Sequence, residues 1–120
     1  MKATQSEVNR ALYGSRSKYR SKRHNGYASK REANVAAQLQ ALERGGQIRH
    51  LREQVRFELV PAQKGARRSE KPLVYVADFT YQDSKDGMRH VVDVKGLRTP
   101  MYVAKRKLML FIHKIEIEEF

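Results

Sequence analysis

The sequence predicts an α/β fold, in which a mixed four-stranded sheet is flanked by helices and the elements follow the order α-β-β-β-α-β. Three observations support this prediction. Two helix-start signals, at Ser29 and Thr99, each precede apolar residues at helical spacing. Three segments between them have the composition or the alternation of strands, and residues 114–120 alternate as a short closing strand. With 120 residues, the chain forms one domain at most.

The first helix is predicted over about residues 29–44. Ser29 and Glu32 form an S-x-x-E capping box at its start, and two consecutive glycines follow its end. Its predicted buried stripe has the spacing i, i+4, i+7 and consists of Val35, Leu39 and Leu42. Glu32 lies one turn before this stripe, so two roles stay open for it: a helix cap, or a carboxylate directed at the sheet.

The first strand is predicted over residues 48–60, where apolar and charged residues alternate until Pro61. Residues 61–72 contain Gly, Pro and several basic residues, and we expect a polar loop on the surface. The second helix is predicted from Thr99 to about Ile112, because Thr followed by Pro suits an N-cap and a first turn. Its predicted core stripe consists of Met101, Leu108, Phe111 and Ile112.

Two further strands, joined by a tight turn, are predicted around the Asp-Gly pair at residues 86–87. With a four-residue loop, residues 84–87, Asp78 faces Asp93 across the ribbon. With a two-residue loop the register moves, and Asp78 faces Lys95. In either register one side of the ribbon gathers two carboxylates and an ammonium, because Asp93 and Lys95 share a strand face.

This cluster is the candidate catalytic site. Like charges opposite each other destabilise a sheet unless something offsets them. Asp78 and Asp93 both adjoin apolar strand residues, where charge is not expected. Divalent cations such as Mg²⁺ bind through one or two carboxylates and keep several waters, and an adjacent Lys can orient or deprotonate an attacking water. The alternative is a solvated strand end that carries a Lys–Asp ion pair.

The composition points to a polyanionic partner. The formal net charge is +12 and the pI is near 10.2, so nucleic acid is the first candidate. The chain has no Cys, which excludes disulfides and thiolate metal sites, and its four His have no ligand-like spacing. No apolar run has the ~20 residues of a membrane helix, so we expect no membrane partner and a cytoplasmic protein.

Residues 1–28 are predicted to form a flexible basic arm, and residues 29–120 the folded domain. Seven basic residues and one acid before His24 give the arm half of the net charge, 7 − 1 = +6. The arm carries three tyrosines that could stack on bases, Tyr13, Tyr19 and Tyr27. The alternative is a solubilising tail without a defined role. The candidate DNA contacts of the whole chain are Arg16, Lys18, Arg20, Lys22, Arg23, Lys30, Arg67, Arg68, Arg98 and Lys105.

The site residues and the element order resemble those of the PD-(D/E)xK nuclease superfamily. The likeness covers about residues 29–120 and is carried by three segments, SKREANVAAQLQAL, VYVADFTY and VVDVKGLRT. Within the superfamily, the chain is most similar to a family of small, phage-encoded, stand-alone proteins long described as a domain of unknown function. Its members are regarded as endonucleases or as Holliday-junction-resolvase-like proteins. The resemblance implies a restriction-endonuclease-like core.

The resemblance also implies a role for each site residue. Asp78 and Asp93 would bind Mg²⁺, for which Mn²⁺ could substitute, with the Val94 carbonyl as a further ligand. Glu32 would support the metal, and Lys95 would handle the water. Two departures from the family pattern, an Ala before Asp78 in place of Pro and an Asp where Glu is commoner, remove no ligand.

The expected function is Mg²⁺-dependent hydrolysis of branched or duplex DNA in phage recombination or packaging, in the cytoplasm of the host cell. A junction resolvase makes two symmetric cuts, which predicts a homodimer with twofold symmetry. Two alternatives stay open, a non-catalytic nucleic-acid-binding protein and an inactive nuclease-fold subunit of a larger assembly. Convergence of Glu32, Asp78 and Asp93 within metal-ligand distance would favour the nuclease, because a binding protein has no reason to cluster three acids.

Overall fold

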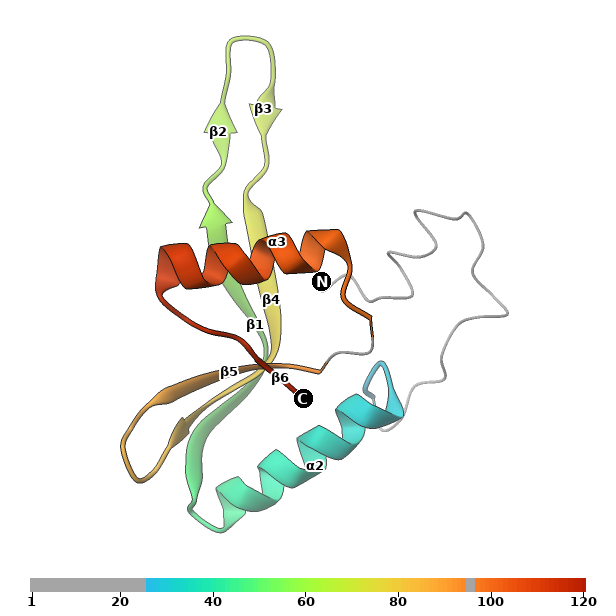
Figure 1. Cartoon of the computed structure of the whole chain (residues 1–120), viewed down its shortest axis with the longest axis vertical. Coiled ribbons are helices and arrows are strands. Elements are labelled where there is room, and N and C mark those ends of the chain that lie inside the picture. Colours follow the sequence, from blue (N-terminus) through green and yellow to red (C-terminus); the bar gives the residue numbers. More distant parts are fainter. Residues whose placement is uncertain (1–25, 95–96) are drawn as a thin grey trace, which may run out of the picture.

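The computed structural model of the chain describes residues 26–94 and 97–120 (Figure 1). The predicted basic arm therefore lies almost wholly outside the described residues, as does Lys95. The elements are α2 (Lys30–Arg44), β1 (Ile48–Val60), β2 (Gln63–Lys64), β3 (Ser69–Glu70), β4 (Leu73–Asp83), β5 (Arg89–Asp93), α3 (Pro100–Leu108), the π-helical turn η2 (Met109–His113) and β6 (Glu118–Glu119).

The main sheet has four strands in the order β1-β4-β5-β6. The β1–β4 and β4–β5 pairs are antiparallel, whereas β5 and β6 are parallel and are connected through α3. Together with α2, these elements follow the predicted order, so the α/β class with a mixed four-stranded sheet is confirmed. In Figure 1, α3 crosses the half of β1 and β4 that leads to β2 and β3, and α2 runs beside the other half.

Helix α2 begins where the capping box predicts. The Ser29 side chain accepts a hydrogen bond of 3.1 Å from the backbone N–H of Glu32. The helix buries Glu32, Val35, Ala36 and Leu39. The packed stripe ends there, because Leu42 in the next turn is 39% exposed, contrary to prediction.

The core consists of two clusters that meet at β4. The first contains Phe57, Leu59, Tyr75, Ala77, Val91, Tyr102, Met109 and Ile117. The second contains Val35, Ala36, Leu39, Ile48, Phe79 and Val92. Successive strand residues point to opposite faces, yet all four residues from Ala77 to Thr80 are buried. Both faces of β4 are therefore covered at Asp78, in the middle of this run.

The β4–β5 hairpin adopts the register that follows from the four-residue loop, residues 84–87. Phe79 pairs with Val92 in the antiparallel ladder. One residue further on from that pair, Asp78 stands opposite Asp93. The sequence left two registers open, and the structure selects the one in which the two carboxylates face each other.

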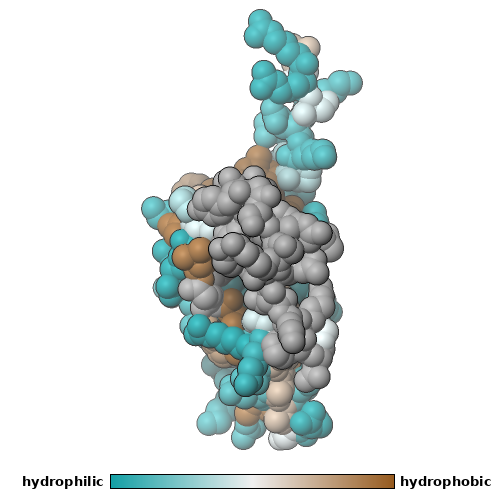
Figure 2. All heavy atoms as spheres, turned by 90° about the vertical axis from the view of Figure 1, so that its right-hand side faces the viewer, coloured by the Kyte–Doolittle hydropathy of each residue, from teal (hydrophilic) through white to brown (hydrophobic). Residues whose placement is uncertain are grey.

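Residues 61–72 are all exposed, as predicted for a surface loop, but they are not irregular. Gln63–Lys64 and Ser69–Glu70 pair as a second, two-stranded antiparallel sheet. The resulting β2–β3 finger continues β1 and β4 away from the body of the protein (Figure 1). In the space-filling view it is a largely hydrophilic projection (Figure 2).

Helix α3 also starts as predicted, because the Thr99 side chain accepts a hydrogen bond of 3.1 Å from the N–H of Tyr102. The predicted core stripe is wrong for three residues, since Met101, Phe111 and Ile112 are 58%, 75% and 40% exposed. Instead, α3 buries Tyr102 and η2 buries Met109. From Met109 onward the chain forms a π-helical turn, which has more residues per turn and so shifts the α-helical phase.

Tyr27, predicted to belong to the basic arm, packs against the folded body. Its ring centroid lies 6.4 Å from that of Phe79, and its hydroxyl donates a hydrogen bond of 2.9 Å to Glu53. Gln40 donates to the same hydroxyl at 3.3 Å. These contacts hold the ring against the core, so Tyr27 is engaged in packing rather than presented for stacking on bases.

Candidate active site

Asp78 and Asp93 form the centre of the candidate site. They are 1% and 3% exposed, and the register of β4 and β5 places them opposite each other, one position beyond the Phe79–Val92 pair. Burying a carboxylate costs free energy unless hydrogen bonds or an opposite charge compensate for the lost water. Part of this compensation for Asp78 comes from the backbone N–H of Val94, which donates to its Oδ2 at 2.8 Å. Two regular strands thus hold two acids at one point inside the protein.

Asp93 accepts a hydrogen bond from a tyrosine that the sequence did not identify. The buried Tyr75 hydroxyl donates to Oδ2 of Asp93 at 2.5 Å. Burial raises the pKa of Tyr75 far above its ordinary value, and the negative charge of Asp93 raises it further. Tyr75 therefore keeps its proton and remains a fixed donor to this carboxylate.

A third acid, Glu119, continues the row across the sheet. It pairs with Asp93 in the parallel β5–β6 ladder, and the N–H of Phe120 donates to the Asp93 carbonyl at 3.0 Å. Asp78, Asp93 and Glu119 thus occupy neighbouring positions on β4, β5 and β6. Among residues 26–94 and 97–120, no three His, Cys, Asp or Glu side chains are grouped so that they could hold a metal ion.

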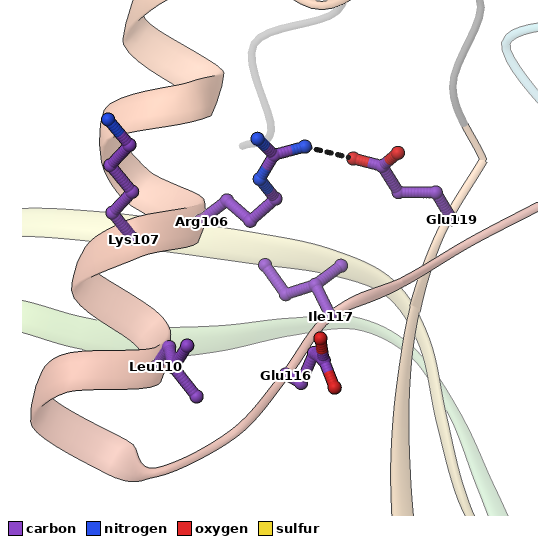
Figure 3. A pocket seen from close by; sticks show the side chains of 6 residues that line it. All are labelled: Arg106, Lys107, Leu110, Glu116, Ile117 and Glu119. Carbon is purple, nitrogen blue, oxygen red and sulfur yellow. Dashed lines mark hydrogen bonds and ion pairs between the residues drawn. The ribbon is translucent and has the colours of Figure 1, made fainter.

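Glu119 is surrounded by donors. Arg98 donates to its Oε1 through Nε at 2.8 Å and Nη2 at 2.6 Å. The Tyr102 hydroxyl and Nη1 of Arg106 donate to its Oε2, at 2.8 Å and 3.0 Å (Figure 3 shows the Arg106 pair). These hydrogen bonds, that of Arg98 first, lower the pKa of Glu119 to about 2. Burial, followed by the bond to Glu119, raises the pKa of Tyr102.

A hollow adjoins this arginine–glutamate cluster. It has a volume of about 420 Å³ and lies between α3 and the segment that leads into β6 (Figure 3). Its lining consists of Arg106, Lys107, Leu110, Glu116, Ile117 and Glu119. Neither Asp78 nor Asp93 lines it, so the hollow borders the candidate site on the Glu119 side.

Glu32 is buried in the first turn of α2, as its place on the helix stripe predicted. The helix packs on Phe79 and Val92, which directly follow Asp78 and precede Asp93 in the chain. Both roles predicted for Glu32 stay open, because the hydrogen bond to Ser29 comes from its backbone N–H and not from its carboxylate. The structure therefore brings two of the three predicted acids face to face, with the third buried in the adjoining helix.

The donor set at the aspartates suits a hard cation. Two carboxylates and the nearby backbone of Val94 supply only oxygen ligands, which Mg²⁺ prefers, and this ion commonly binds one or two carboxylates and retains water. Lys95, predicted to act on the water, lies outside the described residues. The metal assignment of Asp78, Asp93, Val94 and Glu32 stays a prediction.

The predicted DNA contacts fall into three groups. Arg16, Lys18, Arg20, Lys22 and Arg23 lie outside the described residues. Lys30, Arg67 and Arg68 are exposed, the last two at the tip of the β2–β3 finger. Arg98 is exposed but bound to Glu119, and Lys105 is half-buried, where burial lowers its pKa. No helix in the described part of the chain is long and apolar enough to cross a membrane.

Comparison with known proteins identifies one family. The family model described as "Protein of unknown function (DUF1064)" matches residues 16–117. This match covers most of the chain, so the protein belongs to that family. No curated protein and no solved structure matches the sequence.

Proposed function

We propose that this DUF1064 protein is a Mg²⁺-dependent DNA endonuclease with a restriction-endonuclease-like core. The observation that carries the proposal is the buried, face-to-face pair Asp78 and Asp93 in a chain of net charge +12. Two carboxylates set opposite each other in a sheet repel, because like charges there are destabilising. A divalent cation would offset this repulsion.

Each residue of the site has a proposed task. Asp78 and Asp93, with the Val94 carbonyl, would hold the cation, and Glu32 would support it from α2. When bound, Mg²⁺ or Mn²⁺ supplies a Lewis acid that polarises the phosphate and lowers the pKa of an attacking water. Lys95 would orient that water or take its proton. Tyr75 holds the Asp93 carboxylate in place through its hydroxyl.

The proposed substrate is DNA, branched or duplex, in phage DNA processing. The basic arm and the β2–β3 finger would contact its phosphates, because Lys64, Arg67, Arg68 and Lys71 are all exposed on the finger. Activity on a four-way junction would require two active sites, and hence a homodimer with twofold symmetry. The host cytoplasm is the proposed place of action.

A second candidate function is binding of nucleic acid without catalysis, alone or as a nuclease-fold subunit of a larger assembly. One observation favours it: the described residues contain no group of three acidic or histidine side chains arranged to hold a metal ion. In that case Asp78 would serve as an acceptor for Val94, and Asp93 for Tyr75, with no cation between them.

The deciding experiment compares cleavage of a labelled four-way junction with that of a matched linear duplex, in Mg²⁺ and in EDTA. We expect metal-dependent cutting by the wild type and none by Asp93→Asn or Lys95→Ala, with binding nearly unchanged in both variants. Paired cuts on the junction alone would support a resolvase, and cuts on both substrates a general endonuclease. Tight, salt-sensitive binding without cutting, in Mg²⁺ and in EDTA, would contradict the nuclease proposal and support the proposal of a non-catalytic binding protein.

A further inference from the structure

We infer that Arg98 and Arg106 form a phosphate-binding subsite beside the paired aspartates, and that Glu119 is the positioning residue that holds both guanidinium groups. The inference rests on the proposed function for its ligand, a phosphate of the DNA backbone next to the one that is cut. Neither Glu119 nor Arg106 carries a role in the resemblance from which the other site residues were predicted.

The hydrogen bonds fix both arginines without using all of their donors. A guanidinium has five N–H groups. Arg98 donates two hydrogen bonds, from Nε and Nη2, to Oε1 of Glu119. Arg106 donates one, from Nη1, to Oε2. Each arginine therefore keeps N–H groups that Glu119 does not take, in a fixed orientation. Such pre-oriented planar donors match the geometry of a phosphate.

Exposure and charge favour an anion at this place. The side chain of Glu119 is 18% exposed, whereas those of Arg98 and Arg106 are 53% and 37% exposed. The acid thus lies beneath two cations that face the solvent. Two guanidinium groups surround one carboxylate, so the cluster has a net charge of +1.

The cluster lies in the right place for a phosphate that neighbours the cut. Glu119 is the direct ladder partner of Asp93, so the arginines flank the strand end that carries the candidate metal ligand. On the other side, Arg106 and Lys107 line the hollow between α3 and the segment leading into β6 (Figure 3). Basic groups of α3 therefore lie on both the aspartate side and the hollow side of Glu119.

The competing explanation is a clamp that only ties β6 to α3. A clamp predicts that loss of either arginine lowers stability, with no specific effect on DNA. The subsite predicts a change in the number of phosphates contacted. The two explanations can be separated by the salt dependence of DNA binding, measured on variants shown to be folded by circular dichroism.

The first test measures binding of a fluorescein-labelled duplex over a series of salt concentrations. For Arg98→Ala and for Arg106→Ala, we expect the slope of log K against log salt to fall by about 1, as for the loss of one phosphate contact. Arg44→Ala is the matched control, because Arg44 is exposed in the last turn of α2 and should leave the slope unchanged. Arg98→Lys keeps the positive charge but lacks the planar guanidinium with its paired donors. Its slope should therefore lie between those of Arg98→Ala and the wild type.

The second test addresses Glu119 as a positioning residue. Glu119→Gln removes a negative charge, so overall DNA affinity should stay equal or rise. The amide no longer holds both guanidinium groups, so kcat should fall about tenfold while KM does not increase, as for a misplaced reactant. A purely structural role would instead lower the melting temperature and leave kcat per folded molecule unchanged.

The outcomes separate the subsite from the nuclease. Unchanged salt slopes in both arginine variants would overturn the subsite, even if the wild type cuts DNA. Reduced slopes with a wild type that cuts nothing in Mg²⁺ or Mn²⁺ would support the subsite as part of a binding protein and overturn the nuclease. A slope reduced by the same amount in Arg44→Ala would also overturn the subsite, because the effect would then follow net charge alone.

Discussion

The hydroxyl of Tyr75 donates a 2.5 Å hydrogen bond to Oδ2 of Asp93, and both residues are buried. A buried carboxylate that loses its donor keeps the full cost of its desolvation. Tyr75→Phe should therefore lower the free energy of unfolding by about 1–3 kcal/mol, measured by urea denaturation. Tyr81→Phe removes a hydroxyl that has no hydrogen bond among the described residues, and should change stability by less than about 0.5 kcal/mol. Equal effects of the two substitutions would contradict the role given to Tyr75.

Asp78 has both a structural and a proposed metal-binding role, and two substitutions separate them. Asp78→Asn keeps an oxygen that can accept from the N–H of Val94, so the protein should fold but should no longer bind Mn²⁺ in a calorimetric titration. Asp78→Ala leaves that N–H without its acceptor and should destabilise the protein by about 1–3 kcal/mol. Wild-type metal affinity in Asp78→Asn would remove this residue from the ligand set.

Stability should depend on acid pH through Glu119. Its pKa is about 2 in the folded protein against an ordinary 4.5, chiefly because Arg98 donates to it. Because the pKa of Glu119 is lower in the folded than in the unfolded protein, its ionised carboxylate stabilises the fold fully above about pH 4.5. This stabilisation is lost as the pH falls towards 2. The free energy of unfolding should decline over this window more steeply in the wild type than in Glu119→Gln. Parallel curves would show that the carboxylate is not stabilised in this way.

The β2–β3 finger should contribute to DNA binding but not to the chemistry. Arg67→Ala combined with Arg68→Ala should reduce the salt slope of binding by about 2 and leave kcat at saturating DNA unchanged. The matched control replaces both residues with Lys, which preserves charge at the same exposed positions. Should the alanine pair bind as the wild type does, the finger would have no place in the interface.

Local signals predicted the elements well because their causes are local. The cap at Ser29 depends on residues three apart. The Asp-Gly turn left only two registers open, and the structure has the one with the four-residue loop. The packing face of α3 was predicted less well. Regular α-helical spacing was applied through residues 109–113, where the chain widens into a π-helical turn and exposes Phe111.

The contacts around the acids could not be predicted in this way. Tyr75 is 18 residues from Asp93, and Arg98 is 21 residues from Glu119, so their meeting depends on strand pairing and on the path of α3. The sequence signal for Glu119 was only its place in the alternating closing segment. Only the parallel pairing of β5 with β6 shows that Glu119 lies beside Asp93.

The outer strand of the sheet has a consequence for self-association. β1 is an edge strand of 13 residues, and an edge strand presents unpaired backbone groups with which another chain can pair and aggregate. Two of its residues, His50 and Gln54, have φ values of 57° and 53°, and its register shifts between Arg49 and Arg52. These irregularities interrupt the row of backbone groups that an incoming strand would need, and the charged arginine side chains of β1 oppose its approach. A homodimer of this protein should therefore not form by pairing of β1 with β1 of the partner subunit.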